Sequence, residues 1–157
     1  MGEAKKLVIQ VDDEPLMMSM AIRREFRGLP GHQLRQVVVG DGSELARKWE
    51  DPVPVIIAAL QAGHEVVLIF DANVCDDRGV KVNSACFVRA LRDGLAALSE
   101  KPTGKVLAFI VWSDDPVAAA TVLEAAKAGL EFSAYEVVGK GFQFAGQLKA
   151  TLELFLD

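Results

Sequence analysis

The stretch from Glu65 to Asp71, EVVLIFD, decides the fold. After Glu65 it is apolar up to the final aspartate, with almost no alternation of polar and apolar residues, which is typical of a parallel strand covered by helices on both faces. A second run of this kind, VLAFIVW, spans residues 106–112, and shorter apolar runs lie at residues 6–11, 34–39 and 135–138. The sequence therefore predicts an α/β fold with a doubly wound, five-stranded parallel sheet.

The segments between these runs carry helix signals. Asp51 with Pro52 and Asp115 with Pro116 are N-cap and first-turn pairs, so we expect helices to begin there and to end near residues 62 and 128. Further helices are expected at residues 16–26, 43–49, 84–98 and 142–155, the last with Phe144, Leu148, Leu152 and Phe155 on one stripe. A polar loop is expected at residues 72–83.

Length and charge limit the function. A chain of 157 residues predicts one domain, spanning 1–157 without an output domain. The net charge of −5 argues against nucleic acid as a ligand, because a phosphate-backbone binder needs clustered positive charge. No segment approaches the ~18 consecutive apolar residues of a membrane span, and the polar start is too short for a secretion signal. We expect a cytoplasmic protein that binds neither membrane nor nucleic acid.

Polar residues follow four of the five expected strands. Asp12 and Asp13 follow the first strand, Asp71 the third, Ser113 the fourth and Lys140 the fifth. The carboxyl ends of parallel strands meet at one edge of the sheet, and the working site of such a fold lies at that edge. The sequence therefore predicts that three carboxylates, a hydroxyl and an ammonium group come together there.

This set of groups is suited to phosphoryl chemistry. Three crowded carboxylates repel one another unless a cation lies among them, and hard oxygen ligands suit Mg²⁺. A carboxylate beside Mg²⁺ can attack phosphorus and form an aspartyl phosphate. The Lys140 ammonium and the Ser113 hydroxyl could each bind one oxygen of the transferred group.

These residues resemble the receiver domain of two-component response regulators. The resemblance covers nearly the whole chain: the acidic pair lies in Val11–Pro15, Asp71 matches the phosphoacceptor, and Asn73 follows it by two residues. Ser113 matches the switch hydroxyl and Lys140 the phosphate-sensing lysine. The resemblance implies a flavodoxin-like topology and a signalling domain that is not an enzyme beyond its own phosphoryl transfer and dephosphorylation.

The resemblance also implies roles and partners. Asp13 and Asp71 would bind Mg²⁺ through their side chains, Asp12 through water and Asn73 through its backbone carbonyl. A histidine kinase or phosphotransfer protein would donate the phosphoryl group to Asp71. Phosphorylation would then alter a face near the fourth helix, fifth strand and fifth helix that binds a downstream protein. Whether the chain also forms a homodimer is left open.

The sequence departs from the receiver pattern in several places. Gly141 follows the lysine where receivers usually have proline, and Asp114 follows the switch hydroxyl where they usually have a small residue. Val137 occupies the usual place of the switch aromatic, which Tyr135 could replace from the same face of its strand. These departures favour an atypical receiver.

Two alternative functions remain open at this point. A degenerate receiver would bind partners without phosphorylation, which Asp114 and Gly141 favour. A phosphohydrolase of the haloacid dehalogenase type also uses an aspartate nucleophile, a hydroxyl, a lysine and Mg²⁺. That family places a second aspartate two residues past the nucleophile, where this chain has Asn73, so its pattern fits less well.

Overall fold

The computed structural model describes residues 6–12, 25, 32–38, 50–75, 80–140 and 142–156. The strands are β1 (Lys6–Asp12), β2 (His32–Val38), β3 (Glu65–Phe70), β4 (Asn73–Cys75), β5 (Lys81–Asn83), β6 (Lys105–Ser113) and β7 (Phe132–Gly139). The helices are α2 (Pro52–Gln61), α3 (Ala85–Ala96), α4 (Pro116–Lys127) and α5 (Gln147–Leu156), with a short 3₁₀ turn at Phe142–Phe144. None of the described helices has the length and apolar character needed to cross a lipid bilayer.

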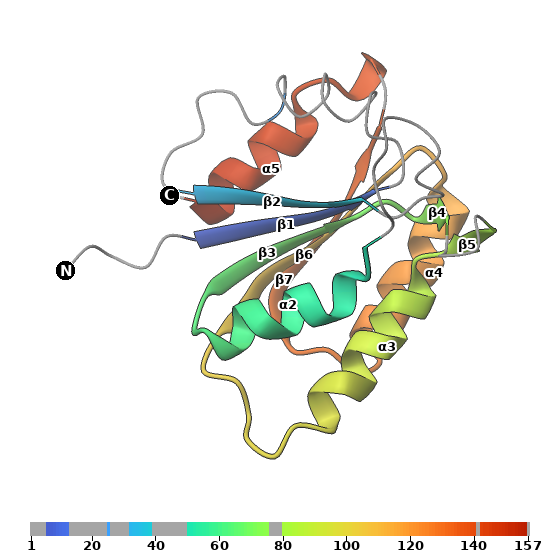
Figure 1. The fold of residues 1–157 in the computed structure, drawn as a ribbon. Coiled ribbons are helices and arrows are strands. Elements are labelled where there is room, and N and C mark those ends of the chain that lie inside the picture. The colour runs from blue at the N-terminus through green and yellow to red at the C-terminus, as the bar shows by residue number, and fades with distance from the viewer. Residues whose placement is uncertain are drawn as a thin grey trace.

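Five strands form one parallel sheet in the order β2-β1-β3-β6-β7 (Figure 1). The chain moves outward in one direction from β1 to β2 and in the other from β3 to β7. The strand order therefore reverses between β1 and β3, and this switch point is where ligands bind in open α/β sheets. The prediction of a doubly wound, five-stranded parallel sheet is confirmed.

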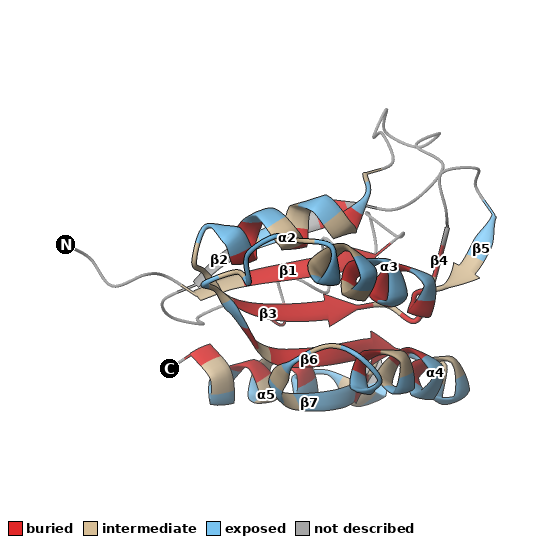
Figure 2. Cartoon of the chain, turned by 90° about the horizontal axis from the view of Figure 1, so that it is seen from below, coloured by how far each residue is buried: buried red, intermediate tan, exposed pale blue. Residues whose placement is uncertain are grey.

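Helices cover both faces of this sheet, as the uninterrupted apolar strands predicted. Helices α2, α3 and α4 pack on one face and α5 on the other (Figure 1). Figure 2 shows the central strands β1, β3 and β6 buried between the helix layers. Along β3, alternate residues contribute to the two cores: Leu68 and Phe70 face the three-helix side, and Ile69 faces α5.

The predicted starts of two helices are confirmed by their caps. The Asp51 carboxylate accepts a hydrogen bond from the Val53 backbone N–H at 3.0 Å at the start of α2. Asp115 caps α4 in the same way through the Ala118 N–H, also at 3.0 Å. Each cap satisfies a backbone donor that would otherwise lack a partner in the first helical turn.

Three sequence-based expectations differ from the structure. The expected polar loop at 72–83 contains an antiparallel ribbon of β4 and β5, whose three-residue strands are too short to give a sequence pattern. Strand β7 is longer than expected because it pairs with β6 from Phe132 to Gly139, although most of it is exposed.

The last helix also differs from the expected one. It begins at Gln147, because Gly146 has a φ of +84°, which a helix does not accommodate. Its fully buried residues are Leu148, Leu152 and Leu156, so the expected stripe is confirmed at Leu148 and Leu152, and Phe155 is partly buried against the same core. Phe144 lies in the preceding 3₁₀ turn, outside this helix. The helices expected at residues 16–26 and 43–49 lie outside the described residues, except for Glu25, which is helical.

The orientation of α5 can be tested with two leucines of the same helix. Leu152 is fully buried against the sheet, whereas Leu154 is 78% exposed. We expect Leu152→Ala to lower the free energy of unfolding by about 2–5 kcal/mol, because it removes buried methyl groups and leaves a cavity. Leu154→Ala should change it by about 0.5 kcal/mol or less. Urea unfolding followed by circular dichroism measures both, and equal losses would contradict this packing.

Candidate functional site

The strand register places Asp12 and Asp71 side by side at the switch point. Val11 of β1 pairs with Phe70 of β3, so the residue after each lies at the same level of the sheet. The Asp71 backbone N–H donates to the Val11 carbonyl at 3.0 Å, which extends this pairing by one residue. Two carboxylates 59 positions apart in sequence are thus neighbours because two adjacent parallel strands end together.

Lys140 lies directly after β7 and contacts both carboxylates. Its Nζ forms an ion pair with Asp12 Oδ2 and another with Asp71 Oδ2, the second at 3.3 Å. Strand β6 separates β7 from β3, so the lysine side chain must pass over the end of β6. It does so beside Trp112, whose ring centroid lies 5.0 Å from Nζ, within the range of a cation–π contact.

Burial strengthens these interactions. The side chains of Asp12, Asp71 and Lys140 are only 1%, 11% and 17% exposed. Burial by itself would lower the pKa of Lys140, but the charges of Asp12 and Asp71 outweigh it and raise the pKa above its usual value. Lys140 is therefore protonated at neutral pH and neutralises part of the negative charge of the site.

Ser84 fixes the chain on the other side of Asp71. Its hydroxyl donates to the Asp71 backbone carbonyl, and its backbone N–H donates to the Ala72 carbonyl at 2.7 Å. Ser84 is buried at the start of α3, so this contact ties the segment after β3 to that helix. The sequence predicts Ser84 only as a helix start, and its sequence neighbours give no sign of this contact.

The predicted switch hydroxyl, Ser113, is the last residue of β6 rather than the residue after it. It is 5% exposed, and its Oγ accepts a hydrogen bond from the Asp115 backbone N–H at 3.1 Å. The register pairs Val111 with Phe70, so Ser113 lies on the strand next to Asp71 and slightly beyond it. In the unphosphorylated chain, its hydroxyl therefore contacts the start of α4.

Asn73 and Asp115 connect the site to α4. The Asn73 side-chain amide donates to the Asp115 carboxylate at 3.2 Å. The backbone hydrogen bond from Ala118 and the one from Asn73 hold the pKa of Asp115 below its usual value, so Asp115 is ionised at neutral pH. The sequence predicts Asp115 only as the N-cap of a helix. The cap is confirmed, and the contact with Asn73 is a feature that the sequence did not reveal.

Two of the acids expected to hold Mg²⁺ come together in the structure. Oxygens of Asp12 and Asp71 converge on a single nitrogen, and these two acids with Lys140 carry a net charge of −1. Hard carboxylate oxygens in such an arrangement suit Mg²⁺. Among the described residues no group of three or more acidic, histidine or cysteine side chains gathers around one point. The third expected acid, Asp13, lies outside the described residues, as does Gly141.

Comparisons with known proteins support the fold. No family model matches the sequence, and no curated protein matches it either. The structure is similar to the signal receiver domain of NarL from Mycobacterium tuberculosis, a protein described as a response regulator. The TM-score is 0.53 at 16% sequence identity, and the match covers 97% of each chain. The predicted flavodoxin-like fold of receiver domains is thereby confirmed.

The ion pairs of Lys140 can be tested in the protein without added metal. We expect Lys140→Met to lower the free energy of unfolding by about 3–5 kcal/mol, because it leaves two buried carboxylates without their cation. The control is Lys101→Met, which removes an exposed pair with Glu131 and should cost less than about 1 kcal/mol. Urea unfolding in the presence of a chelator measures both variants. Equal stability of the two would show that Lys140 does not neutralise this site.

Proposed function

We propose that this chain is a cytoplasmic phosphoacceptor domain of a two-component phosphorelay, phosphorylated on Asp71. The observation that carries the proposal is the position of the Lys140 ammonium, which reaches the Asp71 carboxylate across the end of β6. A lysine so placed can bind an oxygen of a phosphoryl group on Asp71. The similarity of the fold to a signal receiver domain agrees with this proposal.

The donor would be the phosphohistidine of a histidine kinase or a phosphotransfer protein. A carboxylate oxygen of Asp71 attacks phosphorus and forms the P–O bond. The P–N bond to histidine breaks, and its electron pair stays on the imidazole nitrogen. Asp71 is suited to this role because its side chain is held at a strand end and is still partly accessible, at 11% exposure. The Lys140 ammonium would then pair with the phosphoryl oxygens instead of the Asp71 carboxylate.

Asp12, Asp13, Asp71 and the backbone carbonyl of Asn73 are the groups that would hold Mg²⁺ in this proposal. The bound ion would neutralise negative charge on the transferred phosphoryl group. Asp12 is the most deeply buried of the described acids in the site, so its carboxylate is fixed before any ligand arrives. Fixed oxygen ligands lower the cost of assembling a cation site.

The output of the proposed signal is a protein-binding face formed by α4, β7 and α5. If the Ser113 hydroxyl turned toward a phosphoryl group on Asp71, it would give up its hydrogen bond to Asp115 at the start of α4. Strand β7 presents Tyr135 and Val137, which are 48% and 41% exposed. Lys127 of α4 lies over the Tyr135 ring, with Nζ 4.2 Å from the centroid, so this side of β7 faces α4. Exposed apolar side chains on an edge strand suit a downstream protein or a second copy of the chain.

An interaction module that works without phosphorylation is the second candidate. It is favoured by Asp114, which is exposed directly after Ser113 and adds negative charge where a phosphoryl donor would approach. Like charges in this position would slow the approach of a phosphorylated partner. Phosphorylation of Asp71 distinguishes the two candidates.

Phosphorylation can be measured with a small-molecule donor. We expect acetyl phosphate with Mg²⁺ to add one phosphoryl group to the protein, visible as a mass increase of the intact chain. Asp71→Asn should abolish the increase because it removes the attacking oxygen. The control is Asp93→Asn, which changes an aspartate that is 72% exposed on α3 and should be labelled like the wild type.

A protein that stays unlabelled under these conditions would favour the second candidate. Labelling that persists in Asp71→Asn would place the acceptor elsewhere. Continuous turnover of a small phosphomonoester, dependent on Asp71, would instead revive the phosphohydrolase alternative.

Binding of Mg²⁺ can be tested without any phosphoryl donor. We expect Mg²⁺ at about 100 times its dissociation constant to stabilise the wild type by about 2.7 kcal/mol, because it binds only the folded state. Asp71→Asn should lose most of this gain, whereas Asp93→Asn should keep it. Thermal unfolding with Mg²⁺ and with chelator gives the difference. An equal gain in both variants would mean that the ion binds away from Asp71.

A further inference from the structure

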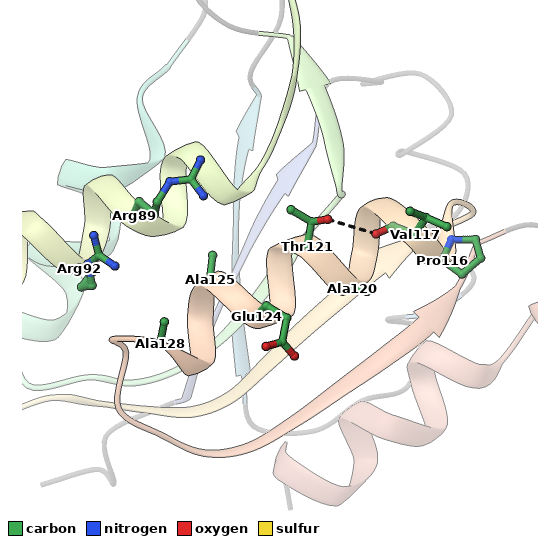
Figure 3. A pocket seen from close by; sticks show the side chains of 9 residues that line it. All are labelled: Arg89, Arg92, Pro116, Val117, Ala120, Thr121, Glu124, Ala125 and Ala128. Atoms are coloured by element: carbon green, nitrogen blue, oxygen red, sulfur yellow. Dashed lines mark hydrogen bonds between the residues drawn. The ribbon is translucent and has the colours of Figure 1, made fainter.

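A groove runs between α3 and α4, away from the phosphoacceptor site. It has a volume of about 810 Å³ and a mostly apolar lining. Figure 3 shows Arg89 and Arg92 of α3 on one side, and Val117, Ala120, Ala125 and Ala128 of α4 on the other. A volume of this size is within the range of ligand-binding clefts in proteins.

The α4 side of the groove is mostly apolar, with Pro116, Val117 and three alanines beside Thr121 and Glu124. Val117 is 79% exposed, which is a large exposure for an apolar side chain at the first turn of a helix. The alanines that follow it along the groove are small, so the backbone of a partner can approach α4 closely. Burying Val117 against a partner would remove apolar surface from water and favour binding.

The α3 side of the groove is basic. Arg89 and Arg92 are three positions apart, which places them on the same face of the helix, roughly 5–6 Å from each other at Cβ. Arg89 is exposed and has no salt-bridge partner in the described part of the chain. Arg92 pairs through Nε with the neighbouring Asp93 at 3.2 Å.

Arg92 is held across the end of the groove by a packing contact. A Cβ atom added at Gly129, just after α4, would lie 2.0 Å from Arg92 Cδ. The aliphatic part of the arginine therefore packs directly on the Gly129 backbone. This contact reduces the conformational freedom that Arg92 would lose on binding a partner.

The charge of the groove is opposite to that of the protein as a whole. The chain has a net charge of −5, yet two guanidinium groups border this apolar surface. The groove also contains Glu124, but its carboxylate points away from both arginines in Figure 3. Arg89 therefore has no carboxylate partner in the described part of the chain, whereas Arg92 keeps its contact with Asp93, and both guanidinium groups lie beside exposed apolar surface.

We propose that the groove between α3 and α4 binds an acidic, amphipathic helix of a partner protein. Its apolar residues would cover Val117 and the alanines of α4, and its carboxylates would bind Arg89 and Arg92. A helix fits because side chains three and four positions apart share a face, which matches the spacing of the two arginines. Arginine–carboxylate pairs give charge-assisted hydrogen bonds, which are among the stronger ones in proteins.

This interaction goes beyond the proposed phosphoacceptor function and does not require it. The groove and its arginines are present in the unphosphorylated chain, and none of the residues that line it belongs to the site at Asp71. Failure of Asp71 labelling would therefore leave this proposal intact, and failure of the experiment below would leave the phosphoacceptor proposal intact.

The test is a selection from a display library of helical peptides. One face of each peptide carries a random mixture of acidic, basic and apolar residues. The target is the full chain, and the counter-target is Arg89→Glu with Arg92→Glu. We expect selected peptides to be enriched in Glu and Asp beside apolar residues at helical spacing. Their dissociation constants, measured by fluorescence anisotropy, should rise at least about tenfold for the double variant.

A charge-matched control separates the groove from the overall charge. Lys101→Glu with Lys105→Glu makes the same change in net charge at exposed positions outside the groove, and binding should stay within about twofold of the wild type. Arg89→Gln with Arg92→Gln provides a milder variant if the glutamates prevent folding. Gly129→Ala should weaken binding without changing any charge, because it displaces Arg92.

Three results would overturn the proposal. The selected peptides could lack enrichment in acidic residues over the starting library. They could bind the arginine variants as tightly as the wild type. Sedimentation could also show that the chain self-associates through Arg89 and Arg92, in which case a second copy, rather than an acidic partner helix, fills the groove.

Discussion

The contact of the Lys140 ammonium with the carboxylates of Asp12 and Asp71 is the interaction on which the rest of the site depends. Two carboxylates in adjacent, buried positions repel each other, and the pairing of β1 with β3 makes that adjacency unavoidable. The compensating positive charge comes from Lys140, which follows the edge strand β7 and reaches both carboxylates across the end of β6. The site is thus formed only when β1, β3, β6 and β7 are in their correct order.

A second set of hydrogen bonds lies beside this contact, at the start of α4. Asn73, two residues after Asp71, binds the carboxylate of Asp115, and that carboxylate also caps α4. Ser113 accepts from the backbone of the same residue. The first residues of α4 after this cap, Pro116 and Val117, belong to the groove beside α3. The start of α4 is therefore a structural link between the site at Asp71 and the groove.

The sequence predicted the parts of the molecule that follow from local patterns. Apolar runs located the strands, and Asp71 and Lys140 could be named as site residues because each directly follows a strand. The contact of Lys140 with Trp112 could not be predicted, since it depends on which strands become neighbours.

Other features were missed because their stability comes from tertiary contacts. The ribbon of β4 and β5 has strands of three residues, and such short strands have no periodicity of their own. Ser84 looked like an ordinary helix start, yet its hydroxyl binds the Asp71 carbonyl from a helix that packs against the sheet. The most direct test of whether Asp71 accepts a phosphoryl group that Lys140 binds is a crystal structure of the chain with beryllofluoride and Mg²⁺. We expect the fluoride adduct on the Asp71 carboxylate with Lys140 Nζ in contact with it. A lysine directed away from an occupied Asp71, or an adduct elsewhere, would contradict the proposed site.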